Sequence, residues 1–351
     1  MTPPVALAPP LHLPIAASVA ASSTPAPSGA TLNSRLSDAL AAQDAVALDA
    51  LRGCSGTDRR DRFLALLTVY DLHTAPLEQI GEAARFQGHP AVAEIKARLE
   101  AEWLVELDRM WQDAGRLAEA TSAERAVTAM RSVAARDRLP AAYKWLAKQA
   151  TWPELVAFLA LEGGPDGGFD DLVSACQIGL SGSAKLELAQ NYWDEMGNGD
   201  PAAVHTQLHD DLVAAVQMPR VPRSAMQVHA LERSALGGLL ATNRWLQPEM
   251  IGALGLLELQ AGPRCRLVLQ AFDRLGAPEQ AYPFYVEHAE VDPRHGKDWV
   301  EKAVGPLVAG RPAWGPRIVR GAWWRSTINL AFFEGLRVQL VQGQGSQDSA
   351  A

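Results

Sequence analysis

The sequence is poor in cysteine, in long apolar runs and in basic clusters, and each shortage excludes a class of protein. Its three cysteines, Cys54, Cys176 and Cys265, lie far apart and form no CxxC pair. Neither a disulfide framework nor a cysteine-based zinc site is therefore expected. No run of 18 or more apolar residues is present, so the sequence predicts no membrane span, and a cytoplasmic protein is expected.

Positive charge is also scarce. The formal net charge is -8, and no long Lys/Arg run occurs in the 351 residues. Because non-specific polyanion binders present a basic face, nucleic acid is not an expected partner. Residues 1–30 are rich in Pro, Ala and Ser and contain no Lys or Arg, the first of which is Arg35. They lack the positive segment of a secretory signal, so we expect a flexible tail.

What the sequence has in abundance is helical periodicity. Ala, Leu, Glu, Arg and Gln dominate from about Leu36 onward, apolar residues recur at spacings of three and four, and strand signatures are scarce. The class predicted is all-α. Helices are expected over 35–52, 58–72, 76–87, 90–115, 121–137, 140–148, 153–161, 169–180, 183–196, 201–217, 224–242, 248–260, 263–275, 278–303 and 316–340.

Breaks in this pattern predict the domain organisation. We expect an N-terminal helical region over 31–148, a second helical domain over 149–340 and a flexible tail over 341–351. The segment from Gly305 to Gly315 is expected to interrupt the last helices, because Gly and Pro are frequent there. No internal repeat of fixed period is present.

One short segment concentrates metal-binding side chains. His288, Asp292 and His295 stand at i, i+4 and i+7, which on a helix places the second and third within roughly 40° and 20° of the first, on one face. Two imidazoles and a carboxylate on one face are costly to bury unless a proton or a metal satisfies them. Pro293 falls inside this helix and predicts either a kink that re-aims His295 or the end of a short helix.

Carboxylates in apolar surroundings lie upstream of this segment. Glu258 interrupts a nearly all-apolar helix, and Glu162 closes the apolar run from Leu155 to Leu161. Both are expected to face inward and to need a partner. Glu195 precedes His205 by ten residues, too far for one ion on an unbroken helix. The break from Gly197 to Pro201, with Asp200 as an expected N-cap, predicts a reversal that brings His205 back toward Glu195.

Together these helices offer the ligand types of a non-heme di-iron or di-manganese centre. A ferritin-like arrangement is excluded, because two suitably placed Glu-x-x-His pairs are missing. Four motifs follow one another along the chain: Glu162, then Asn191-Tyr-Trp-Asp-Glu195-Met-Gly-x-Gly with His205, then Glu258, and finally His288-x3-Asp292-x2-His295-Gly. In their order and spacing they resemble the motifs of the heme-oxygenase-like di-iron oxidases and oxygenases. These are often labelled iron-containing redox enzymes. The resemblance covers roughly residues 150–335.

The resemblance implies a heme-oxygenase-like helical bundle with two Fe(II) ions, O2 as co-substrate and no heme. It implies that one iron is held by Glu162, His205 and His295, and the other by Glu258, His288 and Asp292, with Glu195 between them. Asp166, Asp170 and Asp171 lie close to Glu162 and are alternatives for the first ligand. The implied reactions are N-oxygenation of an amine, or hydrogen abstraction from an aliphatic carbon leading to desaturation or C–C cleavage.

The expected partner is a small-molecule substrate. No flavin, iron–sulfur or nicotinamide motif is present, so electrons are expected to come from that substrate or from a separate reductase. Homodimer formation and substrate gating are both compatible roles for residues 31–148. Two alternative functions stay open. One is a metal-free enzyme similar to the thiamine-degrading TenA-like proteins, which would depend on a cysteine such as Cys176. The other is a non-catalytic interaction or iron-sequestering protein.

A second cluster has two readings. Trp323 and Trp324 stand with Arg317, Arg320 and Arg325 near the end of the chain. They are compatible with a pocket for an acidic substrate. The favoured interpretation is a helix that packs its aromatic side chains inward and extends its arginines past them.

Overall fold

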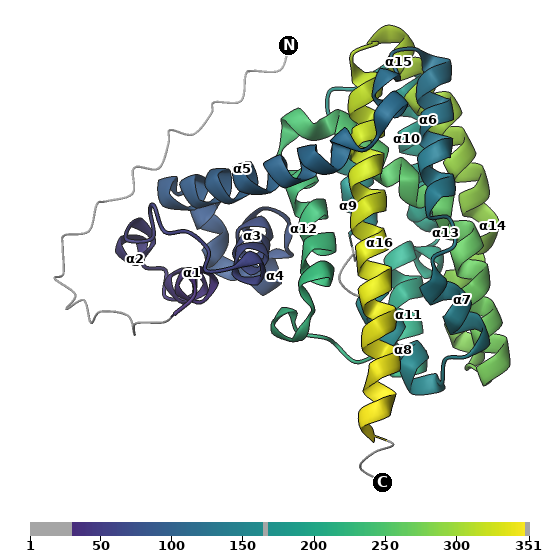
Figure 1. The fold of residues 1–351 in the computed structure, drawn as a ribbon, viewed down its shortest axis with the longest axis horizontal. Helices are drawn as coiled ribbons and strands as arrows, with labels where there is room; N and C mark the ends of the chain where they lie inside the picture. Colours follow the sequence, from purple (N-terminus) through teal and green to yellow (C-terminus); the bar gives the residue numbers. More distant parts are fainter. Residues whose placement is uncertain (1–29, 164–167, 348–351) are drawn as a thin grey trace, which may run out of the picture. The chain divides into compact units, whose positions relative to one another are not determined.

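All regular structure in the described part of the protein is helical (Figure 1). The computed structural model describes residues 30–163 and 168–347, so the tail predicted over 1–30 lies almost wholly outside the described residues. The all-α prediction is confirmed. No helix in the described ranges is both long enough and apolar enough to cross a membrane.

The first part of the chain forms short and medium helices. They are α1 (Leu32–Ala41), α2 (Ala45–Asp49), α3 (Arg59–Thr74), α4 (Leu77–Ile80), the 3-10 helix η1 (Gly81–Gly88), α5 (Pro90–Gln112), η2 (Gly115–Glu119), α6 (Ala123–Arg136) and α7 (Ala141–Lys148). Polar N-caps define several starts: the side chain of Asp44 accepts hydrogen bonds from the first turn of α2, and Ser122 does so for α6.

The second part contains the longer helices. They are α8 (Trp152–Glu162), α9 (Phe169–Cys176), α10 (Gly182–Glu195), η4 (Gly197–Gly199), η5 (Pro201–Ala203), α11 (His205–Val216), η6 (Arg223–Ala225), α12 (Val228–Thr242), η7 (Arg244–Leu246), α13 (Gln247–Leu275), η8 (Glu279–Ala281), α14 (Tyr282–Asp298), the π-helix η9 (Trp299–Val304), α15 (Gly305–Gly310) and α16 (Trp314–Gln347). A capping box between Thr151 and Glu154, with Pro153 in the first turn, begins α8.

Helix α13 is the centre of the packing. It packs along α14 and along α16, and α7 and α6 also contact it (Figure 1). Helices α6 and α7, expected to belong to the N-terminal region, thus pack on the long helices, and α3 packs on α12. From Thr31 onward, the described residues form one compact unit. The domain boundary near 148 stays a prediction.

Several predicted helix boundaries were wrong. Residues 35–52 form two helices, because Gln43 adopts a left-handed conformation and Asp44 caps a new start. The expected helix 76–87 is a single α-turn followed by 3-10 structure. The predicted break between 260 and 263 is absent: α13 continues through Pro263. The segment from Gly305 to Gly315 contains α15, and α16 runs on to Gln347.

Candidate metal centre

A tight reversal after α10 brings Glu195 and His205 together. Three successive residues, Gly197, Asn198 and Gly199, have positive φ. A side chain at Gly197 would place its Cβ 2.6 Å from the backbone carbon of Ala203, so only glycine fits there. The predicted N-cap is confirmed, since Asp200 Oδ1 accepts from the amide of Ala202. Nδ1 of His205 consequently lies 2.7 Å from Oε2 of Glu195.

A close approach between α13 and α14 brings Glu258 and His295 together. A Cβ on Gly296 would lie 2.8 Å from the backbone oxygen of Glu258, so the glycine after His295 lets the two backbones touch. Pro293 does not end the helix: α14 continues through it to Asp298, and the proline ring faces Gly262. Nδ1 of His295 lies 3.7 Å from Oε2 of Glu258.

The first group of potential ligands consists of Glu195, His205 and His288, whose donor atoms all lie within 4.8 Å of one another. Nε2 of His288 is 3.1 Å from Nδ1 of His205. Nδ1 of His288 is 2.5 Å from the carbonyl oxygen of Phe284. A carbonyl only accepts, so Nδ1 carries the proton and Nε2 presents a lone pair to the group.

The second group consists of Glu195, Glu258 and His295, all buried. Nε2 of His295 lies 2.9 Å from Oδ2 of Asp194. A carboxylate there holds the ring proton on Nε2, so Nδ1 carries the lone pair. This Nδ1 and Oε2 of Glu258 are both buried and have no hydrogen-bond partner among the described residues. Two unpartnered acceptors facing each other are what a bound cation would satisfy.

The charges around these groups favour a cation as well. Burial, together with the nearby Glu195, raises the pKa of Glu258 to about 8. Burial, together with Glu258 and Glu195, raises the pKa of Asp292 well above its ordinary value. Burial and the neighbouring His205 lower the pKa of His288 to about 4. Carboxyls that cannot all ionise and an imidazole that stays neutral form a site that lacks positive charge.

Glu195 behaves differently from the other two acids. Burial alone would raise its pKa, but the hydrogen bond with His205 and the imidazoles of His205, His288 and His295 outweigh burial and lower the pKa. Glu195 is thus the carboxylate most ready to ionise, and it is also the residue that both groups share.

The remaining two predicted ligands lie outside both groups. Oδ1 of Asp292 is 3.9 Å from Nδ1 of His295, so Asp292 borders the second group. Glu162 accepts a 2.9 Å hydrogen bond from the Tyr143 hydroxyl and lies 3.8 Å from the Arg233 guanidinium. Among its alternatives, neither Asp170 nor Asp171 joins a group, and Asp166 lies outside the described residues.

The pairing of the histidines also differs from the implied one. The structure places His205 with His288 and His295 with Glu258, whereas the resemblance implied His205 with His295 and His288 with Glu258. The assignment of each side chain as a metal ligand stays a prediction.

Sequence reasoning missed two residues that support the site. Asp194 fixes the His295 ring, and the Asn191 amide donates a 2.9 Å hydrogen bond to Oε1 of Glu258. Both lie within the motif quoted for Glu195 on α10, where Asp194 and Glu195 follow Asn191 by three and four residues. Helical periodicity would have placed Asn191 on the same face as Glu195 and Asp194. That signal was available in the sequence.

A small cavity of about 20 Å³ lies among these side chains, lined by Asp194, Glu195, Ala203, His205, Leu208, Glu287, His288, Val291, Asp292 and His295. It is large enough for about one water-sized sphere. The convergent lone pairs, the unpartnered buried atoms and this space together fit a metal ion held by carboxylates and imidazoles.

Comparison with known proteins agrees with this reading. Residues 156–329 match the family model described as iron-containing redox enzyme. No curated protein matches the chain. The matched range runs from within α8 to within α16 and contains every predicted ligand. The predicted family and its helical fold are thereby confirmed.

Proposed function

Because residues 156–329 belong to the iron-containing redox enzyme family, we propose that this oxidoreductase is a non-heme di-iron oxidase or oxygenase that oxidises a small metabolite with O2. One observation supports two metal ions rather than one. Glu195 belongs to two groups of three potential ligands, one with His205 and His288 and the other with Glu258 and His295. A carboxylate has two oxygens and can serve two ions.

In this proposal His205 and His288 hold one ion, Glu258 and His295 hold the other, and Glu195 lies between them. Asp292 and Glu162 complete the set. When bound, two ferrous ions supply electrons for the reduction of O2. The chain fixes the ligands in advance: Phe284 orients His288, Asp194 orients His295, and Asn191 orients Glu258. Such supporting hydrogen bonds commonly change metal affinity 10- to 100-fold.

The donor types support non-heme iron. A heme requires a broad apolar cavity and one or two axial ligands. Here four carboxylates and three imidazoles line a cavity of only about 20 Å³. Carboxylates and imidazoles are the ligands of non-heme iron oxygenases.

The reaction class proposed is N-oxygenation of an amine, or aliphatic hydrogen abstraction leading to desaturation or C–C cleavage. Electrons come from the substrate or from a separate reductase. A homodimer is also proposed, with residues 31–148 contributing to assembly or to substrate gating.

The test is an anaerobic titration of the metal-free full-length chain with ferrous iron, followed by exposure to O2. We expect about two irons per chain and an O2-dependent visible absorption. Glu195→Ala and His288→Ala are expected to abolish that absorption and to lower iron uptake. Glu290→Ala is the matched control, because Glu290 is exposed on the same helix two residues after His288.

Each other outcome has a definite meaning. Uptake of two irons without O2-dependent absorption or product, even with candidate amines present, would indicate an iron-sequestering protein. Absence of iron binding would end the proposal.

A further inference from the structure

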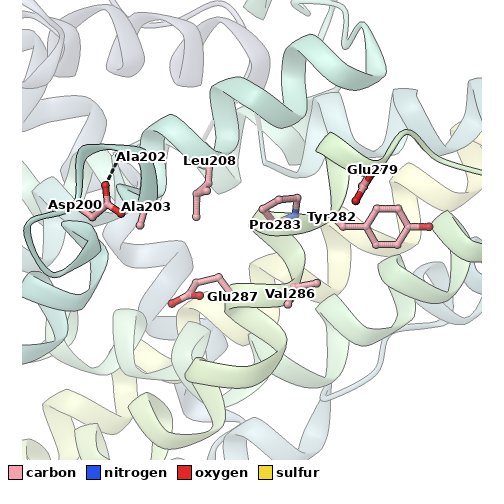
Figure 2. A pocket seen from close by; sticks show the side chains of 9 residues that line it. All are labelled: Asp200, Ala202, Ala203, Leu208, Glu279, Tyr282, Pro283, Val286 and Glu287. Atoms are coloured by element: carbon pink, nitrogen blue, oxygen red, sulfur yellow. Dashed lines mark hydrogen bonds between the residues drawn. The ribbon is translucent and has the colours of Figure 1, made fainter.

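A larger cavity adjoins the candidate metal centre. Its volume is about 550 Å³, and it lies open between the η5–α11 segment and the η8–α14 segment (Figure 2). Three of its lining residues, Ala203, Leu208 and Glu287, also line the small cavity that contains the potential ligands. The two cavities therefore share a wall, and a molecule in the larger one would lie beside the metal centre.

The lining of this larger cavity, here called the outer cavity, is apolar with acidic side chains. Its residues are Asp200, Ala202, Ala203, Leu208, Glu279, Tyr282, Pro283, Val286 and Glu287. No Lys, Arg or His belongs to the lining. Figure 2 shows the Tyr282–Glu287 turn of α14 on one side and the Asp200–Leu208 segment on the other.

The three acids are not equivalent. Asp200 Oδ1 already caps η5 by accepting from the amide of Ala202. Glu279 is exposed at the outer end. Glu287 alone lines both cavities, and the described residues include no ion-pair partner for it. The hydroxyl of Tyr282 is occupied by a 3.1 Å hydrogen bond to Asp273, so this residue offers mainly its ring to the outer cavity.

We propose that the outer cavity is the substrate site and that it takes a small molecule with an apolar body and a protonated amine. Leu208, Pro283 and Val286 contact the apolar body, and the carboxylate of Glu287 binds the ammonium. An anionic substrate is disfavoured, because every charged side chain of the lining is negative. The inference rests on the proposed function, since it is the adjoining metal centre that makes this cavity a substrate site.

Binding of simple probes to the metal-free full-length chain tests the inference without any turnover. Hexylammonium, hexan-1-ol and hexanoate share one alkyl chain and differ in charge, and ligand-observed NMR measures their relative affinities. We expect hexylammonium to bind best and hexanoate worst. Glu287→Gln should weaken hexylammonium binding about fivefold, the size of a partly exposed charge pair. Glu287→Lys should reverse the order, and Glu290→Gln should change nothing.

Two further variants locate the probe. Val286→Trp should fill the outer cavity and weaken binding of hexylammonium and hexan-1-ol while leaving iron uptake unchanged. Glu258→Gln should leave hexylammonium binding unchanged. Hexylammonium binding that responds to Glu258→Gln but not to Glu287→Gln would place the probe among the metal ligands and overturn the inference. Equal or tighter binding of hexanoate by the unmodified chain would also overturn it.

The iron titration on the same preparations separates this inference from the proposed function. If iron does not bind but hexylammonium binding depends on Glu287, the di-iron function fails and the cation-binding cavity stands. If two irons bind and hexylammonium binding is insensitive to Glu287, the inference fails and the di-iron function stands.

Discussion

Two buried glutamates on the same helix, α13, have opposite surroundings. Glu249 is fully buried and lies between two guanidiniums, with Arg317 Nε 2.8 Å from Oε1 and Arg320 also bound to Oε1. Glu258 is equally buried, yet its Oε2 has no hydrogen-bond partner among the described residues. Its neighbours are the acids Glu195, Asp194 and Asp292.

The difference supports the proposal that Glu249 is a structural carboxylate and Glu258 a metal ligand. Burying a charge is costly, and the chain offsets that cost at Glu249 with its own arginines. At Glu258 no arginine offsets the cost, so the raised pKa favours the protonated form, and under the proposed function a bound cation would take the place of that proton. Strain of this kind is typical of functional sites. The residues near Trp324 fit the packing interpretation only in part: Trp324 is buried and Arg317 and Arg320 bind Glu249, but Arg325 is itself buried and does not extend past the aromatic side chains.

Neutralising each glutamate in turn gives the largest expected effect. Glu249→Gln leaves two arginines without their anion, and we expect it to lower the free energy of unfolding by about 2–3 kcal/mol, reduced from the fully buried case because both arginines are partly exposed. Glu258→Gln mimics the protonated acid without requiring a proton to be taken up on folding, so we expect the metal-free chain at pH 7 to be no less stable and, in direction, more stable than the unmodified chain. Urea unfolding of the metal-free variants measures both. Similar losses for the two would contradict the comparison.

The pH dependence of stability sharpens the same contrast. The pKa of Glu258 is raised to about 8 from an ordinary value near 4.5. The stability that the protonated group contributes is therefore complete below pH 4.5 and is lost as the pH rises through 8. We expect the melting temperature of the metal-free chain to fall by several degrees between pH 5 and pH 9, and the fall to shrink in Glu258→Gln.

Adding a divalent ion should counteract this fall in melting temperature at high pH. Metal binding requires deprotonated carboxyls, so its stabilisation should grow as the pH rises over the same range. Differential scanning fluorimetry with and without zinc(II) measures it. A metal-induced shift that is the same at pH 5 and pH 8 would show that these carboxyls are not ligands.

A smaller effect is expected at the residue that orients His295. Asp194→Asn removes the carboxylate from Nε2 of His295, and iron affinity should fall about tenfold. Asp211→Asn is a matched control: Asp211 is exposed and accepts a 2.9 Å i, i+4 hydrogen bond from Gln207, as Asp194 does from Gln190. Competition with a chelator of known affinity gives both values. Equal effects of the two variants would show that Asp194 has only a structural role.

The smallest effect is expected in the labelling of the cysteine thiols. Burial raises the pKa of the Cys176 thiol to about 12, and its Sγ donates to the carbonyl of Val173. Burial also raises the pKa of Cys265. Ellman's reagent at pH 8 should therefore label Cys54 in the native chain and the other two only after unfolding. Rapid native labelling of Cys176 would revive the TenA-like alternative, which needs a reactive cysteine.

Much of the fold followed from local signals. Periodicity predicted the all-α class, and the Asp200–Pro201 pair predicted the helix start that returns His205 to Glu195. Predictions failed where packing overrides local preference. The Gly262–Pro263 pair reads as a break, but α13 continues because Gly262 leaves room for the ring of Pro293 on α14. Local signals also gave no sign of the different neighbours of Glu162 and Glu258: Tyr143 from α7 donates a hydrogen bond to Glu162, and the role of Glu162 as a ligand stays a prediction.

The sequence by itself determined which side chains are present and where helices turn them inward, because residue type and helical spacing are local properties. Tertiary structure alone decided their partners. Glu249 and Glu258 stand nine residues apart on one helix, and only the arrival of α16 at one and of α10 and α14 at the other gives the first two arginines and the second none. The free-energy cost of a buried charge depends on the groups around it, and those groups come from distant parts of the chain.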